Sequence, residues 1–418
     1  MSGTKLGTPQ RVLLRSAITT AISIAGAGLV FGAVSAQAAD VKIGGLWGVT
    51  GPVSKFIPPL KDAATLAIKQ INDQGGVLKG DKLSLVLGDT KCDGKTSSAA
   101  ANKLVNINKV VAINGALCSG ATIAAANTVG IPGGVVMISP ASTSPAITNL
   151  KDNDFIYRVT PADDFQGKIL ARVLKKRGIN SVAITYIQND YGKGLAQALK
   201  SSYEALGGKV AGFAAHEGKK ASYRSELATL KKGGAKHLVV IAYAADSGPV
   251  IMRQSLERGY FRKFVGVDGV NEDSMLAKVG WQNVQGMVIT NSGSIPGTAG
   301  DKAYSAAMKA AYPNSFGKPF SANTYDATFM IALAIEAAGS TDRTAIRDGL
   351  RKISGPGGVV ILPGEWAKAK KALAAGQKIN YEGAAGPHDF DKAGDVPGVI
   401  DVFEVRGKKR VLVEKIAK

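Results

Sequence analysis

The sequence is poor in cysteine and histidine, and this shortage excludes several classes of site. Only two cysteines, Cys92 and Cys118, and three histidines occur among the 418 residues. Structural zinc sites need more clustered Cys and His ligands than that. The sequence also has no GxSxG elbow, HExxH helix or GxxxxGK[ST] loop, which removes the patterns of serine hydrolases, zinc proteases and P-loop NTPases. We therefore expect a protein that has no metal and no cofactor and is not an enzyme.

Long apolar runs are scarce too, and only residues 17–34 form one. This run follows three basic residues and is diluted by Ser, Thr and Gly, and small residues at 36 and 38 then suit a signal peptidase. A cleaved export signal over residues 1–38, cut near Ala38, is favoured over a membrane anchor. Because neither cysteine directly follows the cut, no lipid anchor is expected, and the mature chain is predicted to reside in a Gram-negative periplasm. The basic residues are Lys5, Arg11 and Arg15.

Acidic residues are outnumbered, with 32 Asp and Glu against 52 Lys and Arg and a formal net charge of +20. Removal of the leader would leave +17. Such an excess is compatible with nucleic-acid binding. However, the cations are spread along the chain, and no zinc-finger spacing or aromatic RNA-binding motif accompanies them. We expect no nucleic-acid partner, and attribute the charge to solubility or to attraction toward acidic surfaces or anionic solutes.

Short apolar runs alternate regularly with amphipathic helical patterns after residue 40. This alternation predicts an α/β protein with parallel sheets covered by helices on both faces, and the pattern occurs twice. A body of this length also favours two domains. We expect two doubly wound, Rossmann-like lobes, formed by residues 39–160 with 292–390 and by residues 161–291 with 391–418. Three crossings would join them, near residues 159–162, 291 and 390. Residues 355–386 are rich in Gly, Ala and Lys and are predicted to form a surface excursion with one short helix.

Polar residues follow the predicted strands where ligands of open α/β sheets bind. Residues 118–122 and 139–145 carry hydroxyls and free N–H groups suited to a carboxylate, although helix capping by Ser and Thr explains either loop alone. Asp268 ends a predicted strand, where it either forms a turn or neutralises a bound ammonium group. In an oxidising compartment the two cysteines suggest one disulfide rather than a nucleophile. His388, among several carboxylates, is interpreted as a structural residue in a turn.

Over nearly its whole mature length the chain resembles the leucine/isoleucine/valine-binding family of ABC-transporter receptors, which have the type I periplasmic-binding (Venus-flytrap) fold. The motifs that carry the resemblance are short and individually weak, but their order and spacing match. They lie at residues 50–52, 71–77, 92–93, 117–119, 137–143, 189–194, 266–269 and 320–325.

The resemblance implies a set of site residues. Family members bridge the positions of Cys92 and Cys118. They hold the ligand α-carboxylate with residues that match Ser119, Ala141 and Thr143, beside Ser142. A tyrosine that matches Tyr191 closes over the ligand from the opposite lobe, and an acidic residue that matches Asp268 accepts the α-ammonium group. Trp47, Phe56 and Phe320 fall where the family lines its side-chain pocket.

Two positions depart from the branched-chain binders. Their second cleft tyrosine aligns with Ala244, next to Tyr243, and Asp268 stands where they have the longer Glu. These departures and the long 355–386 segment argue against a strict preference for leucine-type side chains. The expected ligand is still an amino acid.

The sequence therefore predicts a monomeric periplasmic receptor that binds an amino acid between two lobes and delivers it to an ABC permease in the inner membrane. The alternatives are the same kind of receptor for an aromatic carboxylate, an amide or a urea-like solute, and a periplasmic sensor.

Overall fold

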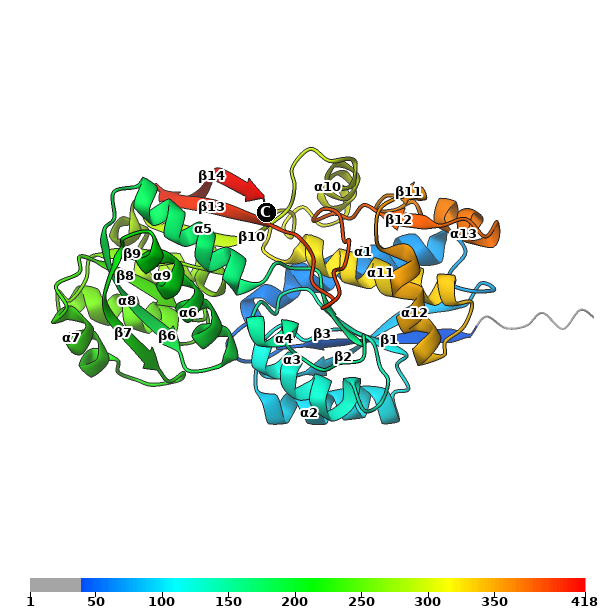
Figure 1. Ribbon diagram of the computed structural model, residues 1–418, viewed down its shortest axis with the longest axis horizontal. Helices are drawn as coiled ribbons and strands as arrows, with labels where there is room; N and C mark the ends of the chain where they lie inside the picture. The colour runs from blue at the N-terminus through cyan, green and yellow to red at the C-terminus, as the bar shows by residue number, and fades with distance from the viewer. Residues whose placement is uncertain (1–38, 418) are drawn as a thin grey trace, which may run out of the picture. The chain divides into compact units, whose positions relative to one another are not determined.

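The computed structural model describes residues 39–417, which contain two large β-sheets that are each covered by helices on both faces (Figure 1). The predicted export signal, residues 1–38, lies outside the described residues. Within residues 39–417, no helix combines the length and the apolar character needed to cross a membrane. The predicted fold class, two doubly wound α/β lobes, is confirmed.

The first lobe is built on a five-stranded sheet in the order β2-β1-β3-β4-β5, in which all neighbours pair in parallel. Its strands are β1 (Asp40–Trp47), β2 (Lys82–Asp89), β3 (Ala112–Gly115), β4 (Met137–Ser139) and β5 (Ile156–Arg158). The helices that follow its strands are α1 (Ile57–Asp73), α2 (Gly94–Asn102), α3 (Ser119–Ala125) and α4 (Pro145–Thr148).

Helix α1 shows why these segments form and where they end. Prolines stand in its first turn, where no backbone N–H is needed, and apolar residues recur at the spacing of one helical face. Gly75 and Gly76 then adopt positive φ angles of 102° and 64°, and the chain turns back toward β2. The buried face contains Leu60, Ala64, Ala67 and Ile71.

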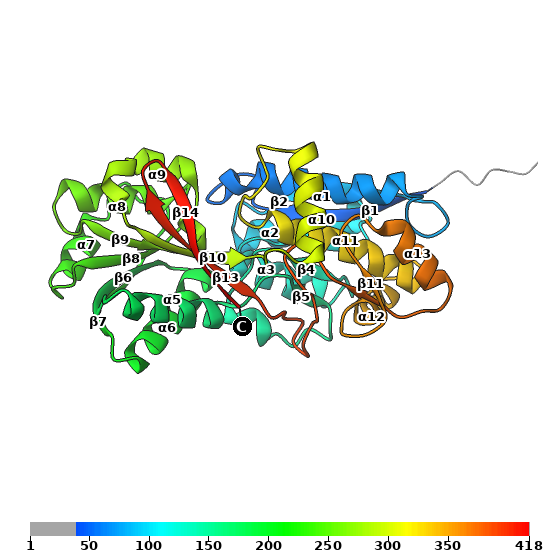
Figure 2. The same ribbon diagram turned by 90° about the horizontal axis from the view of Figure 1, so that it is seen from above.

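The second lobe is built on a seven-stranded sheet in the order β14-β13-β10-β9-β8-β6-β7. The strands from β10 to β7 are parallel, and a C-terminal hairpin adds two antiparallel strands at the edge. Figure 2 shows the strands between α5 and α6 on one side and α7, α8 and α9 on the other. The strands are β6 (Ser181–Ile187), β7 (Lys209–His216), β8 (His237–Ile241), β9 (Lys263–Gly266), β10 (Val288–Gly293), β13 (Val399–Arg406) and β14 (Lys409–Ala417); the helices are α5 (Asp163–Lys176), α6 (Asp190–Ala205), α7 (Arg224–Lys231), α8 (Ser247–Glu257) and α9 (Asp273–Val279).

The chain passes three times between the two sheets. It leaves the first sheet after β5, returns after β10, and enters the second sheet again at β13. Between the second and third passages lie α10 (Ala299–Ala311), α11 (Ser321–Ala338) and α12 (Arg343–Ile353). Helix α11 packs on α1, β3 and β4 of the first lobe, and residues 323–335 are all buried.

The segment 355–386 contains the predicted short helix and many exposed residues, but part of it is buried. It contains β11 (Val359–Ile361) and β12 (Ile379–Tyr381), which pair in parallel, and α13 (Trp366–Ala374). Trp366 is fully buried, and its indole meets the Phe329 ring of α11 edge-on at 5.8 Å between centroids. The Trp366 Nε1–H also donates a hydrogen bond to the Gly76 carbonyl at 2.9 Å. A few large apolar side chains pack this segment against α11. Its high content of Gly, Ala and Lys gave no indication of these contacts in the sequence.

Candidate functional site

A small cavity lies between the carboxyl ends of the strands of both sheets, where ligands of α/β folds bind. Its volume is about 30 Å³, which accommodates roughly two water molecules. The backbone N–H of Ala245, after β8, donates to the Pro52 carbonyl, after β1, at 3.3 Å, so the two lobes are in contact beside it. The cavity is lined by Val53, Phe56, Leu60, Leu117, Cys118, Ser119, Ala141, Tyr191, Tyr243, Asp268, Gly269 and Phe320.

The first lobe contributes neutral polar groups to this cavity. Ser119 is the first residue of α3, and its hydroxyl accepts the Ser144 N–H at 3.1 Å, which leaves the hydroxyl proton free to donate. Ala141 lies in the loop after β4, where the Ser139 hydroxyl accepts the N–H of Ser142 at 2.9 Å. Hydrogen bonds within the two loops thus fix the wall from which Ser119 faces the cavity.

The second lobe contributes a carboxylate that is held by two donors. Asp268 follows β9 at the start of the short helix η4 (Asp268–Val270) and is only 5% exposed. Its Oδ1 accepts the Tyr191 hydroxyl at 2.9 Å and the Gln166 side-chain amide at 3.0 Å. The Tyr191 ring, on α6, stacks on Tyr243 with 5.4 Å between centroids. These contacts direct the carboxylate toward the cavity that Ser119 lines from the other side.

The Asp268 carboxylate has no counter-ion within residues 39–417, because no Lys, Arg or His there forms a salt bridge with it. Burial raises the pKa of Asp268 to about 6, while hydrogen bonds from Tyr191 and Gln166 oppose that rise. Burial likewise raises the pKa of the Tyr191 and Tyr243 hydroxyls, which therefore stay neutral donors at pH 7. Near neutral pH the cavity thus presents an anion at one end and neutral donors at the other.

The remaining wall is apolar. Phe56 and Phe320 meet edge-on at 6.2 Å between centroids, and Leu60 and Leu117 lie next to them along the lining. Phe320 has a φ of 61°, a conformation that costs a non-glycine residue about 1–3 kcal/mol. An apolar side chain would fit against this wall.

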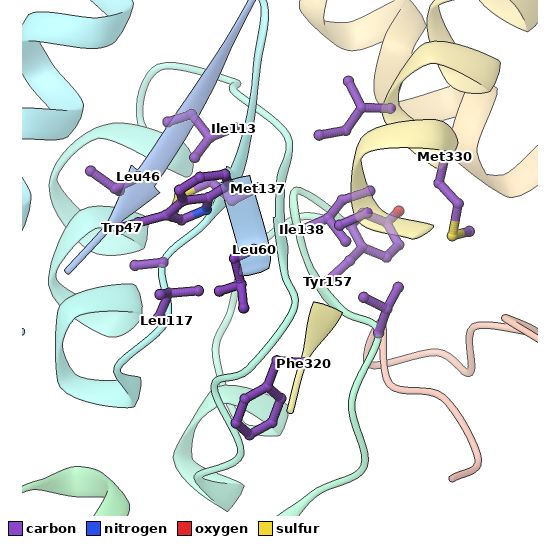
Figure 3. Close-up of a cluster of buried hydrophobic side chains, with 14 of the residues drawn as sticks. Leu46, Trp47, Leu60, Ile113, Leu117, Met137, Ile138, Tyr157, Phe320 and Met330 are labelled. Atoms are coloured by element: carbon purple, nitrogen blue, oxygen red, sulfur yellow. The ribbon is translucent and has the colours of Figure 1, made fainter. Parts of the chain in front are cut away.

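Of the eleven residues predicted from the sequence to bind the ligand, seven line the cavity and four do not. Trp47 is fully buried, and Figure 3 shows its ring beside Leu60 and Leu117 and apart from Phe320. It supports the wall from behind. Ser142 is turned inward, since its hydroxyl pairs with Thr122 at 2.7 Å.

The other two residues outside the lining are Thr143 and Ala244. Thr143 is buried, and its carbonyl accepts the Asp163 N–H at 2.8 Å next to the first crossing between the sheets. Ala244 has no side chain long enough to reach the cavity, and its N–H donates to the Gly269 carbonyl at 2.8 Å. Tyr243 faces the cavity in its place.

Several lining and supporting residues were missed in the sequence. Val53, Leu60 and Leu117 are ordinary apolar residues without a distinguishing motif, and only the fold places them at the cavity. Gln166 and Asp163 carried a weak signal, because polar residues three apart at a helix start share one face.

The predicted disulfide between Cys92 and Cys118 is present, with 5.4 Å between the Cα atoms. It joins the turn after β2 to the residue before α3, directly next to Ser119. The predicted structural role of His388 agrees with its place, since its buried Nε2 lies 2.7 Å from the Asp326 carboxylate, away from the cavity lining.

A family model described as periplasmic binding protein matches residues 40–406. The chain belongs to this periplasmic binding protein family. A relative of this periplasmic binding protein is the leucine-, isoleucine-, valine-, threonine- and alanine-binding protein of Pseudomonas aeruginosa, with 32% identity over 337 residues, which cover 80% of the chain and 87% of the relative. The recognised resemblance is therefore confirmed.

Solved structures agree with the fold. A leucine-binding protein from Thermotoga maritima superimposes with a TM-score of 0.76 at 25% identity, and the match covers 90% of this chain and 98% of that one. A solute-binding protein from Rhodopseudomonas palustris in complex with 4-hydroxybenzoate has a TM-score of 0.72 at 18% identity, covering 90% and 97%. At that low identity the second match shows the fold alone.

Proposed function

We propose that the mature chain is a monomeric periplasmic receptor that binds an amino acid with an apolar side chain and delivers it to an ABC permease in the inner membrane. In this proposal residues 1–38 are the cleaved signal. The first lobe comprises residues 39–160 and 292–390, and the second comprises residues 161–291 and 391–418. The lobes part to admit the ligand and close over it, and no chemical step is involved.

The observation that supports this function most is the buried, unneutralised Asp268 carboxylate opposite Ser119 in one cavity. A buried anion is costly unless a cation joins it, and a ligand ammonium group supplies one. Ser119 then donates to the ligand carboxylate, Tyr191 keeps its hydrogen bond to Asp268, and the side chain lies against Phe56 and Phe320. Because residues of both lobes line the cavity, we propose that the lobes separate for entry.

Closure explains why both lobes contribute to the site. A ligand shifts the open–closed equilibrium only by its difference in affinity for the two states. Contacts to Ser119 on one lobe and Asp268 on the other exist together only when the lobes are closed. The closed form is the one that we propose docks on the permease.

Titration calorimetry tests the ammonium contact. We expect an apolar amino acid such as leucine to bind and its analogue without the amino group, 4-methylpentanoate, to bind at least 100-fold more weakly. Asp268→Asn should lose a similar factor for leucine, since removing one member of a buried ion pair costs about 3–5 kcal/mol. Asp164→Asn, at an exposed position of α5, is the matched control and should bind normally.

A receptor for an aromatic carboxylate is the second candidate, favoured by the rings of Phe56, Tyr191, Tyr243 and Phe320 around the cavity. In that case 4-hydroxybenzoate would bind more tightly than leucine, and Asp268→Asn would leave its affinity unchanged or improve it. That pair of results would overturn the amino-acid proposal.

A further inference from the structure

Asp163 is a second buried carboxylate near the cavity, and the proposed function assigns no role to it. It is the first residue of α5 and is fully buried. Neither of its carboxylate oxygens has a hydrogen-bond partner among residues 39–417. An ionised carboxylate without a partner is unfavourable in a buried position. We therefore expect Asp163 either to be protonated or to gain a positively charged or hydrogen-bonding partner.

The position of Asp163 on α5 places it beside Asp268. Gln166, three residues later on the same helical face, donates its side-chain amide to Asp268 Oδ1 at 3.0 Å. The N–H of Asp163 donates to the Thr143 carbonyl at 2.8 Å, and the buried Thr143 hydroxyl also has no partner in the described chain. Of these three residues Asp268 lines the cavity, while Asp163 and Thr143 are buried outside its lining.

Stabilisation of the helix N-terminus does not account for this arrangement. An acidic side chain in the first turn is favourable, but the exposed Asp164 already occupies that turn. A cation that acts on Asp163 is Arg158. Its guanidinium is committed to Asp395 at 2.6 Å and to the Ser144 carbonyl at 3.0 Å.

The groups that face Asp163 disfavour its ionised form. Burial and the Asp268 charge raise the pKa of Asp163 well above its ordinary value, although the Thr143 hydroxyl and the Arg158 charge oppose that rise. Two adjacent buried carboxylates do not both ionise without a cation. The proton belongs on Asp163, because Asp268 accepts two hydrogen bonds that stabilise its charged form.

We propose that Asp163 and Asp268 share one proton when no ligand is bound, and that a primary ammonium group of the ligand displaces this proton into solvent. This inference rests on the proposed function. The O–H bond of Asp163 breaks, its proton passes to water or buffer, and the ligand keeps its own three N–H donors. The ammonium group lies against Asp268, and the positive charge that it brings stabilises the ionised form of Asp163.

Calorimetry at pH 7.5 in buffers with different heats of ionisation measures the protons released on binding. We expect about one proton released per leucine bound by the parent protein and by the control Asp164→Asn. Asp163→Asn, which has no proton to lose, should release less than half as much.

The outcomes separate the two proposals. Tight leucine binding with a heat that does not depend on the buffer would overturn the shared proton and leave the proposed function intact. Failure of every amino acid to bind would overturn the function itself. The parent protein alone decides the first question, so poor folding of Asp163→Asn would not prevent the test.

Discussion

At the scale of single residues, the site depends on one feature: Asp268 is buried without a cation of the described chain. A raised pKa in the folded state means that folding binds a proton, and this contribution to stability is present below the unfolded-state pKa. It is lost as the pH rises through the folded-state value of about 6. The site is therefore unfavourable for stability at neutral pH until a ligand supplies the positive charge.

The direction of this change in stability with pH gives a prediction for the protein without ligand. Between pH 4 and pH 7 the free energy of unfolding of Asp268→Asn should rise relative to the parent by about 3 kcal/mol, because the variant lacks the carboxylate that is costly to ionise. Chemical denaturation at each pH measures it. A difference between the two proteins that stays constant with pH would contradict the prediction.

The same titration affects binding. Below pH 6 Asp268 becomes protonated, so an ammonium ligand must displace a further proton. This further proton should make the fall in leucine affinity, measured by calorimetry, about tenfold per pH unit steeper below pH 6 than above it. An affinity that is constant from pH 7 to pH 4.5 would show that Asp268 does not contact the ammonium group.

At the scale of elements, the short helix η4 sets the position of Asp268. A Cβ atom at Gly269 would lie 2.3 Å from the Ala242 carbonyl oxygen, which is backbone and cannot move away cheaply. Gly269→Ala should therefore displace η4 and weaken leucine binding at least tenfold. Gly94→Ala on α2, where the nearest heavy atom is a side-chain carbon at 3.2 Å, is the control and should bind normally.

The segment with β11, α13 and β12 acts on stability and not on the site. Trp366→Ala removes a fully buried indole and should lower the free energy of unfolding by about 3–5 kcal/mol. Leucine affinity should not change, since Trp366 does not line the cavity. Val360→Ala, at a position that is 44% exposed, is the control and should cost less than about 1 kcal/mol.

Helices and strands could be predicted where the pattern of apolar residues was long. Elements with a short or mixed pattern could not. The pattern of α11 is long and continuously apolar, and residues 323–335 are all buried. Strand β5 has only three residues, too few to show one. Part of the segment 355–386 is buried, because Trp366 and a few other large side chains pack on α11. Their partners are distant in sequence, so the sequence pattern did not indicate this packing.

At the scale of the whole molecule, the two lobes meet at a cavity that neither lobe forms alone. The sequence located the loops after the strands, because their hydroxyls and Asp268 have a recognisable chemistry. It did not show that Trp47 and Ser142 point into the core or that Asp163 joins the site. Those outcomes depend on side-chain directions that only the packed fold determines.

Closure is the motion that the site requires, and solution scattering measures it. Saturating leucine should reduce the radius of gyration of the parent protein, because contacts to Ser119 and Asp268 stabilise the closed form. Asp268→Asn at the same leucine concentration should not contract. Equal radii with and without leucine in the parent protein would show that binding does not depend on lobe closure.

The central claim is that one cavity holds the two charged ends of an amino acid from opposite lobes. A crystal structure of the complex with leucine tests it most directly. The account predicts the ligand nitrogen at about 3 Å from Asp268, with its carboxylate on Ser119 and its side chain against Phe56 and Phe320. A ligand nitrogen far from Asp268, or leucine bound elsewhere on the molecule, would contradict the account.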